Sequence, residues 1–350
     1  MKKKMILKVS GAFSAAVLSI CFLYNCSDKI YRNIDFISKI AAKNIFYLNY
    51  ENKTEKAENN IYIEKDEIKI KEIKEDAFED ASLKNEEIRE ETPVQIDTNA
   101  AEMTISGGSE FSGISIKIGE DTEEIDFEEK LNEKLDINTA VDGSPTVLLY
   151  HTHTCECYDS NEDDEVRSTD NTRNVVGVGE AIKRKLESYG IGVIHDTTIY
   201  DTTYNGSYYR SEEGVLKILE ENPQIEITID IHRDSLLTAQ GEKIRPIANI
   251  NGKRAAQIMI ISGCDPDGSL GFPNWRENLK FSLHLQKRMT DISPSLPRPL
   301  YYCNRVYNMY LTNASILIEV GTDANYPNEA FYAGELFGEA LAKEILENSK

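Results

Sequence analysis

Apolar and polar residues alternate with two different periods between residues 146 and 348. Short apolar runs bounded by turn residues predict buried strands, and apolar residues that recur every three or four positions predict amphipathic helices. Val178, Ile182 and Leu186 show the helical spacing, and Gly190 is a favourable stop after them. The predicted strands cover 146–150, 191–196, 225–232 and 314–322, and the predicted helices cover 174–190, 211–223, 274–289 and 326–348. This alternation predicts an α/β fold, with a mainly parallel twisted sheet flanked by helices.

Turn residues add local detail to this pattern. Asn251-Gly252 stands between two apolar runs in residues 244–262, which is a strong hairpin signal. Residues 105–121 are Gly-rich and predict a small strand pair. The turn-rich stretch at 140–145 predicts a boundary, so that a folded domain would cover 143–350.

The N-terminal residues have a different composition. Residues 1–27 begin with three lysines and continue into an apolar stretch, which predicts a signal anchor. A cleaved signal peptide and a lipoprotein at Cys21 are the alternatives. Residues 28–142 predict a membrane-proximal segment and an acidic extended linker, because much of this region is too polar to form a core. We therefore expect a single-pass membrane protein with its folded domain on the extracytoplasmic side.

Charge and cysteine usage narrow the function. The formal net charge of −21 argues against nucleic acid as a partner, because phosphate binding needs a basic surface. Six cysteines in 350 residues do not make a disulfide framework. Free thiols are expected for most of them, and spacing alone does not decide whether Cys264 and Cys303 pair.

Ionisable residues gather where the predicted strands end. His151 and His153 follow the strand at 146–150, His232 ends the strand at 225–232, and Glu319 lies near the end of the strand at 314–322. Functional groups in open α/β sheets collect at the carboxyl ends of strands. Glu180, at the start of the first helix, can lie on the same side of the sheet. Two imidazoles, a carboxylate ligand and a further carboxylate are what a catalytic zinc ion needs.

Each of these residues also has a simpler explanation. A lone histidine at a strand end is commonly a hydrogen-bonded structural residue, and a carboxylate at a helix start is commonly there because of the helix dipole. His195 and His284 lack such context and are interpreted as structural. A Cys155 nucleophile has weak support. Asp230, two residues before His232 on the same strand face, is expected to support a ligand or to have a structural role at the sheet edge, without binding metal.

Several motifs resemble stage II sporulation protein P, a family of membrane-anchored peptidoglycan hydrolases. They are LLYHTHTCECY, VVGVGEAIKRKLE with YGIGVIHD, YNGSYYRS, IDIHRDS, NWRENLKFSLHLQ and SILIEVGTDANYPNEA, between about residues 146 and 345. That family is similar to zinc-dependent N-acetylmuramoyl-L-alanine amidases. The resemblance implies zinc ligands at His153, Glu180 and His232 and a general base at Glu319. His151 competes with His153 and otherwise supports the ligands through hydrogen bonds.

The resemblance also implies a substrate and a partner. The expected reaction is amide cleavage between muramic acid and L-alanine during engulfment in sporulation, with cross-link cleavage as a second activity. Stage II sporulation protein D is the expected partner at the engulfing membrane. Residues that could contact the substrate are Arg233, Asp234, Tyr208, Tyr209 and Trp275. The alternatives are a different zinc peptidase or amidohydrolase, and a non-catalytic module that binds cell wall or a partner.

Overall fold

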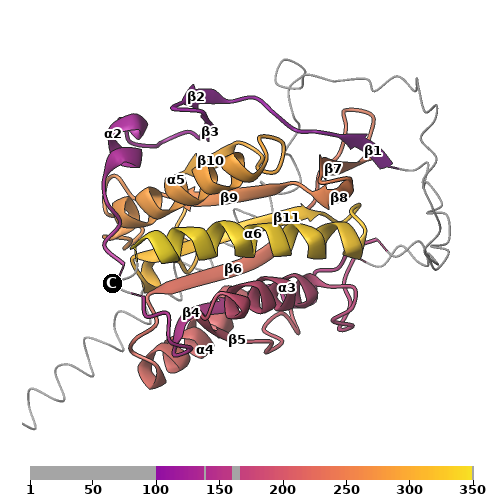
Figure 1. Cartoon of the computed structure of the whole chain (residues 1–350). Helices are drawn as coiled ribbons and strands as arrows, with labels where there is room; N and C mark the ends of the chain where they lie inside the picture. The colour runs from indigo at the N-terminus through magenta and orange to yellow at the C-terminus, as the bar shows by residue number, and fades with distance from the viewer. Residues whose placement is uncertain (1–99, 138, 160–165, 349–350) are drawn as a thin grey trace, which may run out of the picture. The chain divides into compact units, whose positions relative to one another are not determined.

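The structure is a computed structural model that describes residues 100–137, 139–159 and 166–348 (Figure 1). The predicted anchor, and the predicted linker up to residue 99, lie outside the described residues. Within the described ranges, no helix is long and apolar enough to cross a membrane.

A mixed eight-stranded sheet forms the centre of the fold, in the order β2-β3-β10-β9-β11-β6-β4-β5. Its strands are β2 (Ser109–Phe111), β3 (Ile114–Ile118), β4 (Pro145–Tyr150), β5 (Gly192–His195), β6 (Ile227–Asp234), β9 (Ile258–Gly263), β10 (Leu300–Cys303) and β11 (Ala314–Thr322). Most neighbours are parallel, and the β2–β3 and β9–β11 pairs are antiparallel. The mainly parallel sheet expected from the sequence is thus confirmed for the described part, with β10 as a strand that the sequence pattern did not reveal.

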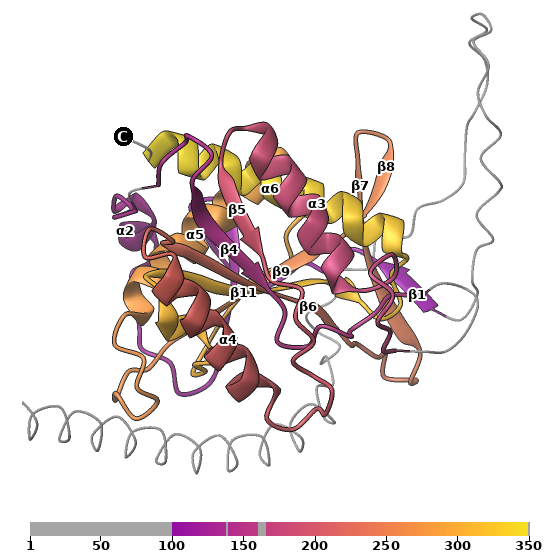
Figure 2. The same cartoon turned by 90° about the horizontal axis from the view of Figure 1, so that it is seen from below.

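Helices cover both faces of this sheet. α3 (Val175–Ser188), α5 (Trp275–Ile292) and α6 (Pro327–Asn348) lie on one face, and α4 (Ser207–Glu221) lies on the other (Figures 1 and 2). A short helix, α2 (Phe127–Asn132), lies beside α5. The Asn174 side chain caps α3 by accepting a hydrogen bond from the Val176 N–H at 3.0 Å. α4 begins four residues earlier than the pattern predicts, directly after Gly206 in a left-handed conformation.

A second, three-stranded sheet joins β1 (Ala100–Met103), β7 (Lys243–Ile250) and β8 (Lys253–Ala256). The predicted hairpin is confirmed as β7–β8. Asn251 and Gly252 both have positive φ, at 53° and 74°, which suits a two-residue hairpin turn.

Residues before 143 belong to both sheets. β1 pairs with β7, and β3 pairs with β10, although the sequence predicts an extended linker up to residue 142. The predicted strand pair within 105–121 is confirmed as β2–β3. Buried apolar residues of β3, Ile114 and Ile116, explain why this segment packs against the domain.

The alternation of side chains along β4 separates two environments. Leu148 and Tyr150 pack with Val215 of α4, whereas Val147 and Leu149 pack in the main core, which includes the apolar faces of α3, α5 and α6. Successive residues of a strand point to opposite faces of the sheet. Groups at the end of this strand are therefore divided between the α3 face and the α4 face.

Candidate functional site

Three neighbouring parallel strands, β4, β6 and β11, end at the same edge of the sheet. Their register aligns Tyr150 with Asp230 and His232 with Glu319. Ile227, Ile229 and Ile231 of β6 belong to the main core, so Asp230 and His232 point to the α4 face. Glu319 shares that face because it is aligned with His232.

His232 lies buried between two carboxylates. Its Nδ1 is 3.4 Å from Glu156 Oε2, and its Nε2 is 3.0 Å from Asp230 Oδ1, although this second contact lacks hydrogen-bond alignment. Burial by itself lowers the pKa of His232, but the charges of Asp230 and Glu156 outweigh it and raise the pKa well above its ordinary value. Without a metal ion, the two carboxylates therefore favour the protonated form of the imidazole.

Asp230 is fixed by hydrogen bonds from the turn after β4. Its Oδ1 accepts from the Thr152 N–H at 2.8 Å, and its Oδ2 accepts from the Thr152 hydroxyl at 2.7 Å. The same hydroxyl lies 2.8 Å from the Ser211 hydroxyl of α4. Asp230 therefore ties His232 to the turn after β4 and, through Thr152, to α4.

His153 is buried in an aromatic surrounding. Its ring stacks on Tyr204 with centroids 4.6 Å apart, and it lies edge-on to Tyr208 at 5.5 Å and to His232 at 5.3 Å. Burial lowers the pKa of His153 to about 4, so this imidazole is neutral at physiological pH. Its Nδ1 is buried without a hydrogen-bond partner in the described structure.

Glu319 lies on β11 opposite His232. Its Oε2 is buried and has no hydrogen-bond partner among the described residues. Burial raises the pKa of the Glu319 carboxyl to about 8, and the nearby Asp234 carboxylate adds to the shift. A carboxyl that titrates near neutral pH is suited to taking up and releasing protons.

The other two histidines of this region form a separate pair. His151 Nε2 lies 2.9 Å from His195 Nε2, and His151 Nδ1 lies 3.1 Å from the carbonyl oxygen of Ile231. Glu180 Oε2 is 3.7 Å from His195 Nδ1. A Cβ on Gly179 would come within 3.0 Å of His151 Nε2, so this pair lies against the start of α3. Of the predicted ligands, the structure brings His153 and His232 together and places Glu180 with the His151–His195 pair.

The residues predicted to contact the substrate lie in different surroundings. Tyr208 lies beside His232 and Tyr307, near the candidate site. Arg233 donates to the backbone carbonyls of Cys157 and Val166, so its guanidinium holds the loop after β4.

Three further predicted residues have structural contacts. Asp234 is paired with Arg298 at 2.8 Å, and the Tyr209 hydroxyl donates to Glu213. Trp275 differs most from the expectation of a groove residue: its side chain is 1% exposed and packs in the core, because α5 turns its first residue inward. It is therefore not accessible to a substrate in this structure.

Glu156 is a site residue whose role the sequence pattern did not indicate. Its Oε2 also accepts from the Arg233 N–H at 3.1 Å. Burial by itself would raise the pKa of Glu156, but His232 and Arg233 outweigh it and lower the pKa to about 2. The signal in the sequence was its spacing of three from His153, which a tight turn converts into proximity.

No disulfide bond joins the four described cysteines, Cys155, Cys157, Cys264 and Cys303. The expectation of mostly free thiols is confirmed for this part of the chain. Cys264 and Cys303, whose pairing the sequence left open, do not form a disulfide bond.

A metal ion is implied by the resemblance, and the donor types suit zinc. In the described ranges, no group of three or more His, Cys, Asp or Glu side chains already has the arrangement of a metal site. Two buried donor atoms of this region nevertheless lack a hydrogen bond, His153 Nδ1 and Glu319 Oε2, and His232 lies next to both residues. Two imidazoles and a carboxylate form a common ligand set of catalytic zinc. The residues present therefore fit the ion in kind.

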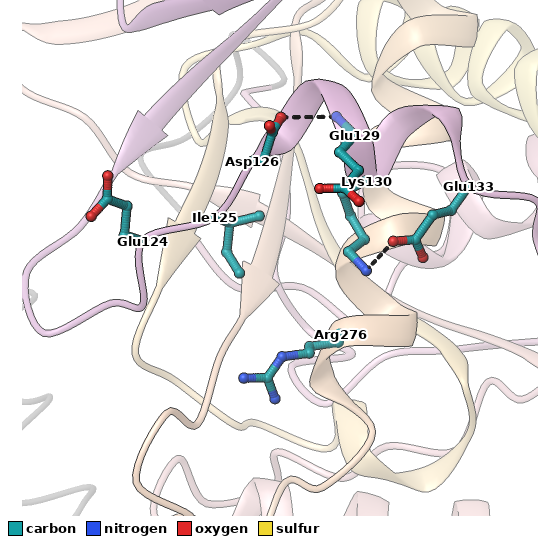
Figure 3. Close-up of a pocket in the computed structure, with 7 residues that line it drawn as sticks. All are labelled: Glu124, Ile125, Asp126, Glu129, Lys130, Glu133 and Arg276. Carbon is teal, nitrogen blue, oxygen red and sulfur yellow. Dashed lines mark hydrogen bonds and ion pairs between the residues drawn. The ribbon is translucent and has the colours of Figure 1, made fainter.

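A hollow elsewhere on the surface is a poor candidate site. It has a volume of about 240 Å³, and Figure 3 shows its lining under α2, with Arg276 of α5 below. Lys130 pairs with Glu133, and Arg276 pairs with Glu123, so both cations of its lining are paired within the fold. None of the histidines lines it.

Comparisons with known proteins agree with the sequence motifs. The family model for stage II sporulation protein P matches residues 30–342. Stage II sporulation protein P of Bacillus subtilis (strain 168) is 32% identical over 190 residues, which cover 50% of this chain and 45% of the relative. The match thus spans about half the length of this curated relative.

Solved structures with similarity include two amidases. N-acetylmuramoyl-L-alanine amidase AmiC2 of Nostoc punctiforme has 13% identity and a TM-score of 0.34, over 59% of this chain and 97% of that chain. The CwlD amidase from Clostridioides difficile, in complex with the GerS lipoprotein, has 14% identity and a TM-score of 0.33, over 58% of this chain and 98% of that chain.

The fold and the site define an α/β protein with an ionisable cluster at the carboxyl ends of its strands. Since the family model covers most of its length, the chain belongs to the stage II sporulation protein P family.

Proposed function

We propose that this chain is a zinc-dependent peptidoglycan hydrolase that cleaves the amide bond between muramic acid and L-alanine. The observation that carries the proposal is the meeting of His153, His232 and Glu319 at the ends of three parallel strands. His153 and Glu319 each contribute a buried polar atom without a hydrogen bond. Membership of the stage II sporulation protein P family supports a role in sporulation.

The residues of the chain divide the chemical work. His153 and His232, with one carboxylate, would hold the ion. A bound zinc ion supplies Lewis acidity. Glu319 takes the proton from the attacking water and delivers it to the leaving amine of L-alanine. Its raised pKa lets the same oxygen serve as base and then as acid.

The aromatic side chains around His153 would form the substrate surface. Tyr204 and Tyr208 both contact the His153 ring. Tyr204 is an exposed residue, so a substrate that reaches His153 would pass along it. A cross-link within the peptide is also an amide, so the same residues would serve both cleavages.

The cellular setting is part of the proposal. The basic and apolar segment at residues 1–27 supports anchoring in the membrane, with the catalytic part outside the cytoplasm. Peptidoglycan is then the accessible substrate. Stage II sporulation protein D is the proposed partner.

The test is an incubation of the full-length chain, purified in mild detergent, with intact cross-linked peptidoglycan. Mass spectrometry of the soluble products would identify stem peptides with a new L-alanine amino terminus. We expect these peptides to be released when zinc is present and not to be released when a chelator removes it. Separated cross-links without such peptides would make the protein an endopeptidase. Release of neither product from the folded, zinc-loaded protein would contradict a hydrolase that acts alone.

A further inference from the structure

Two carboxylates compete for the third position of the metal site, and the structure places them differently. Glu180 is the residue that the resemblance assigns to this role. Glu156 is the carboxylate that the fold places against His232. The contacts of the two side chains decide between them.

A tight turn brings Glu156 close to His153. The Glu156 N–H donates to the His153 carbonyl at 3.0 Å, which closes the turn. The hydroxyl of Thr154, within the turn, lies within hydrogen-bond distance of two backbone carbonyls, of His151 and Thr198. Cys155 is held by the Asp201 carboxylate through its N–H. The path of the chain between His153 and Glu156 is therefore fixed by the fold.

The Glu156 side chain already occupies a ligand-like position. Its side chain is 14% exposed, and its Oε2 lies 3.4 Å from His232 Nδ1. The opposite nitrogen of the same ring lies 3.0 Å from Asp230. A metal-binding histidine commonly faces its metal with one nitrogen and a carboxylate with the other. Asp230 would be that outer carboxylate, which leaves Nδ1 and Glu156 on the side of the ion.

Glu180 has the opposite character. Its side chain is 45% exposed and lies 3.9 Å from Arg184 on the same helix. Its contact with a histidine is to His195, on the α3 face of the sheet. His232 and Glu319 point to the α4 face. A ligand role for Glu180 would require it to leave His195 and reach across the end of the sheet.

We propose that Glu156, together with His153 and His232, binds the zinc ion, and that Glu180 does not. This inference rests on the proposed function, because it concerns the metal of the same site. Glu180 instead orients His195, which in turn contacts His151. His151 Nδ1 contacts the carbonyl oxygen of Ile231, next to His232.

The experiment compares Glu156→Gln with Glu180→Gln in the full-length chain. Each variant removes one carboxylate charge and keeps nearly the same shape. Zinc affinity is measured by competition with a chromophoric chelator, and the ligand field is read from the visible spectrum of bound Co²⁺. We expect Glu156→Gln to weaken zinc binding by about 100-fold or more, beyond the usual cost of losing an outer partner. Glu180→Gln should change the affinity by less than about threefold and leave the Co²⁺ spectrum unchanged.

The outcomes separate this inference from the proposed function. If the wild type binds zinc but Glu156→Gln retains its affinity, the assignment of Glu156 is wrong while a zinc enzyme remains. If the wild type binds no zinc, the metal part of the proposed function fails as well. If Glu156→Gln does not fold, the exposed Glu180→Gln variant decides alone. A changed Co²⁺ spectrum or lost zinc in that variant overturns the inference, and an unchanged spectrum supports it.

Discussion

Replacing Glu319 with glutamine should remove activity and stabilise the metal-free protein at the same time. The substitution keeps the size of the side chain and removes its ability to ionise. As the proposed general base, Glu319 would contribute a rate factor of about 10²–10⁴. The loss of product release should therefore be of that order, with zinc still bound.

The change in stability follows from the pKa of this carboxyl. An ordinary glutamate has a pKa of 4.5, whereas burial raises that of Glu319 to about 8 in the folded, metal-free protein. Between these values the folded state holds a proton that the unfolded state has released. The free energy of unfolding therefore falls as the pH rises from 4.5 towards 8. At pH 7 this penalty is on the order of 3 kcal/mol, from 1.36 kcal/mol per pKa unit.

The assay is urea denaturation of wild type and Glu319→Gln, followed by circular dichroism in the presence of a chelator. Wild type should lose stability relative to the variant between pH 5 and pH 8. At pH 5 the two proteins should have similar free energies of unfolding, because the Glu319 carboxyl is protonated and uncharged in the folded wild type, like the glutamine amide of the variant. Parallel pH profiles would refute the argument that Glu319 is a buried carboxyl with a raised pKa. Full hydrolytic activity in the variant would refute its role as the base.

Three further substitutions test other parts of the structure. Asp230→Asn should weaken zinc binding by about 10–100-fold without abolishing it, because Thr152 still positions the side chain; complete loss of zinc in a direct titration would contradict a supporting role. Glu344→Gln should lower the free energy of unfolding by about 2 kcal/mol at pH 7, because Glu344 accepts from His284 and is paired with an arginine. Burial acts to raise the pKa of Glu344, but these partners lower it, so the difference in thermal midpoint should shrink as the pH falls below 4.5. Gly252→Val should lower the free energy of unfolding by about 1 kcal/mol, because the turn needs positive φ at this residue. An unchanged midpoint in chemical denaturation would count against this turn geometry.

The sequence predicted the elements whose patterns are local. The apolar run ending at Tyr150, the helical spacing of Val178, Ile182 and Leu186, and the Asn251-Gly252 turn each correspond to an observed element. β10 was missed because its four residues, LYYC, are too short to show a period. β3 was placed in a linker because its partner strand begins at residue 300, and no local signal reports such a pairing.

The candidate site was predictable only in part. His153 and His232 could be found because each lies at or just after the end of a recognisable strand, and both lie at the same edge of the sheet. The environment of Glu180 could not be predicted, because it depends on the face of the sheet to which the neighbouring histidines point. Glu156 was overlooked because its proximity to His232 arises from a turn and from the β4–β6 register, and both are tertiary features.

The pairing of β3 with β10 has a consequence for folding. Ile116 is aligned with Leu300, so this edge of the sheet can form only after most of the chain has been synthesised. Pairings between such distant residues are slow, since a long loop must close before the contacts form. Until then β10 has an open edge, which is a template for association between chains. A fragment that begins at residue 143 would keep this edge open permanently, and we expect it to aggregate more readily than one that begins at residue 100.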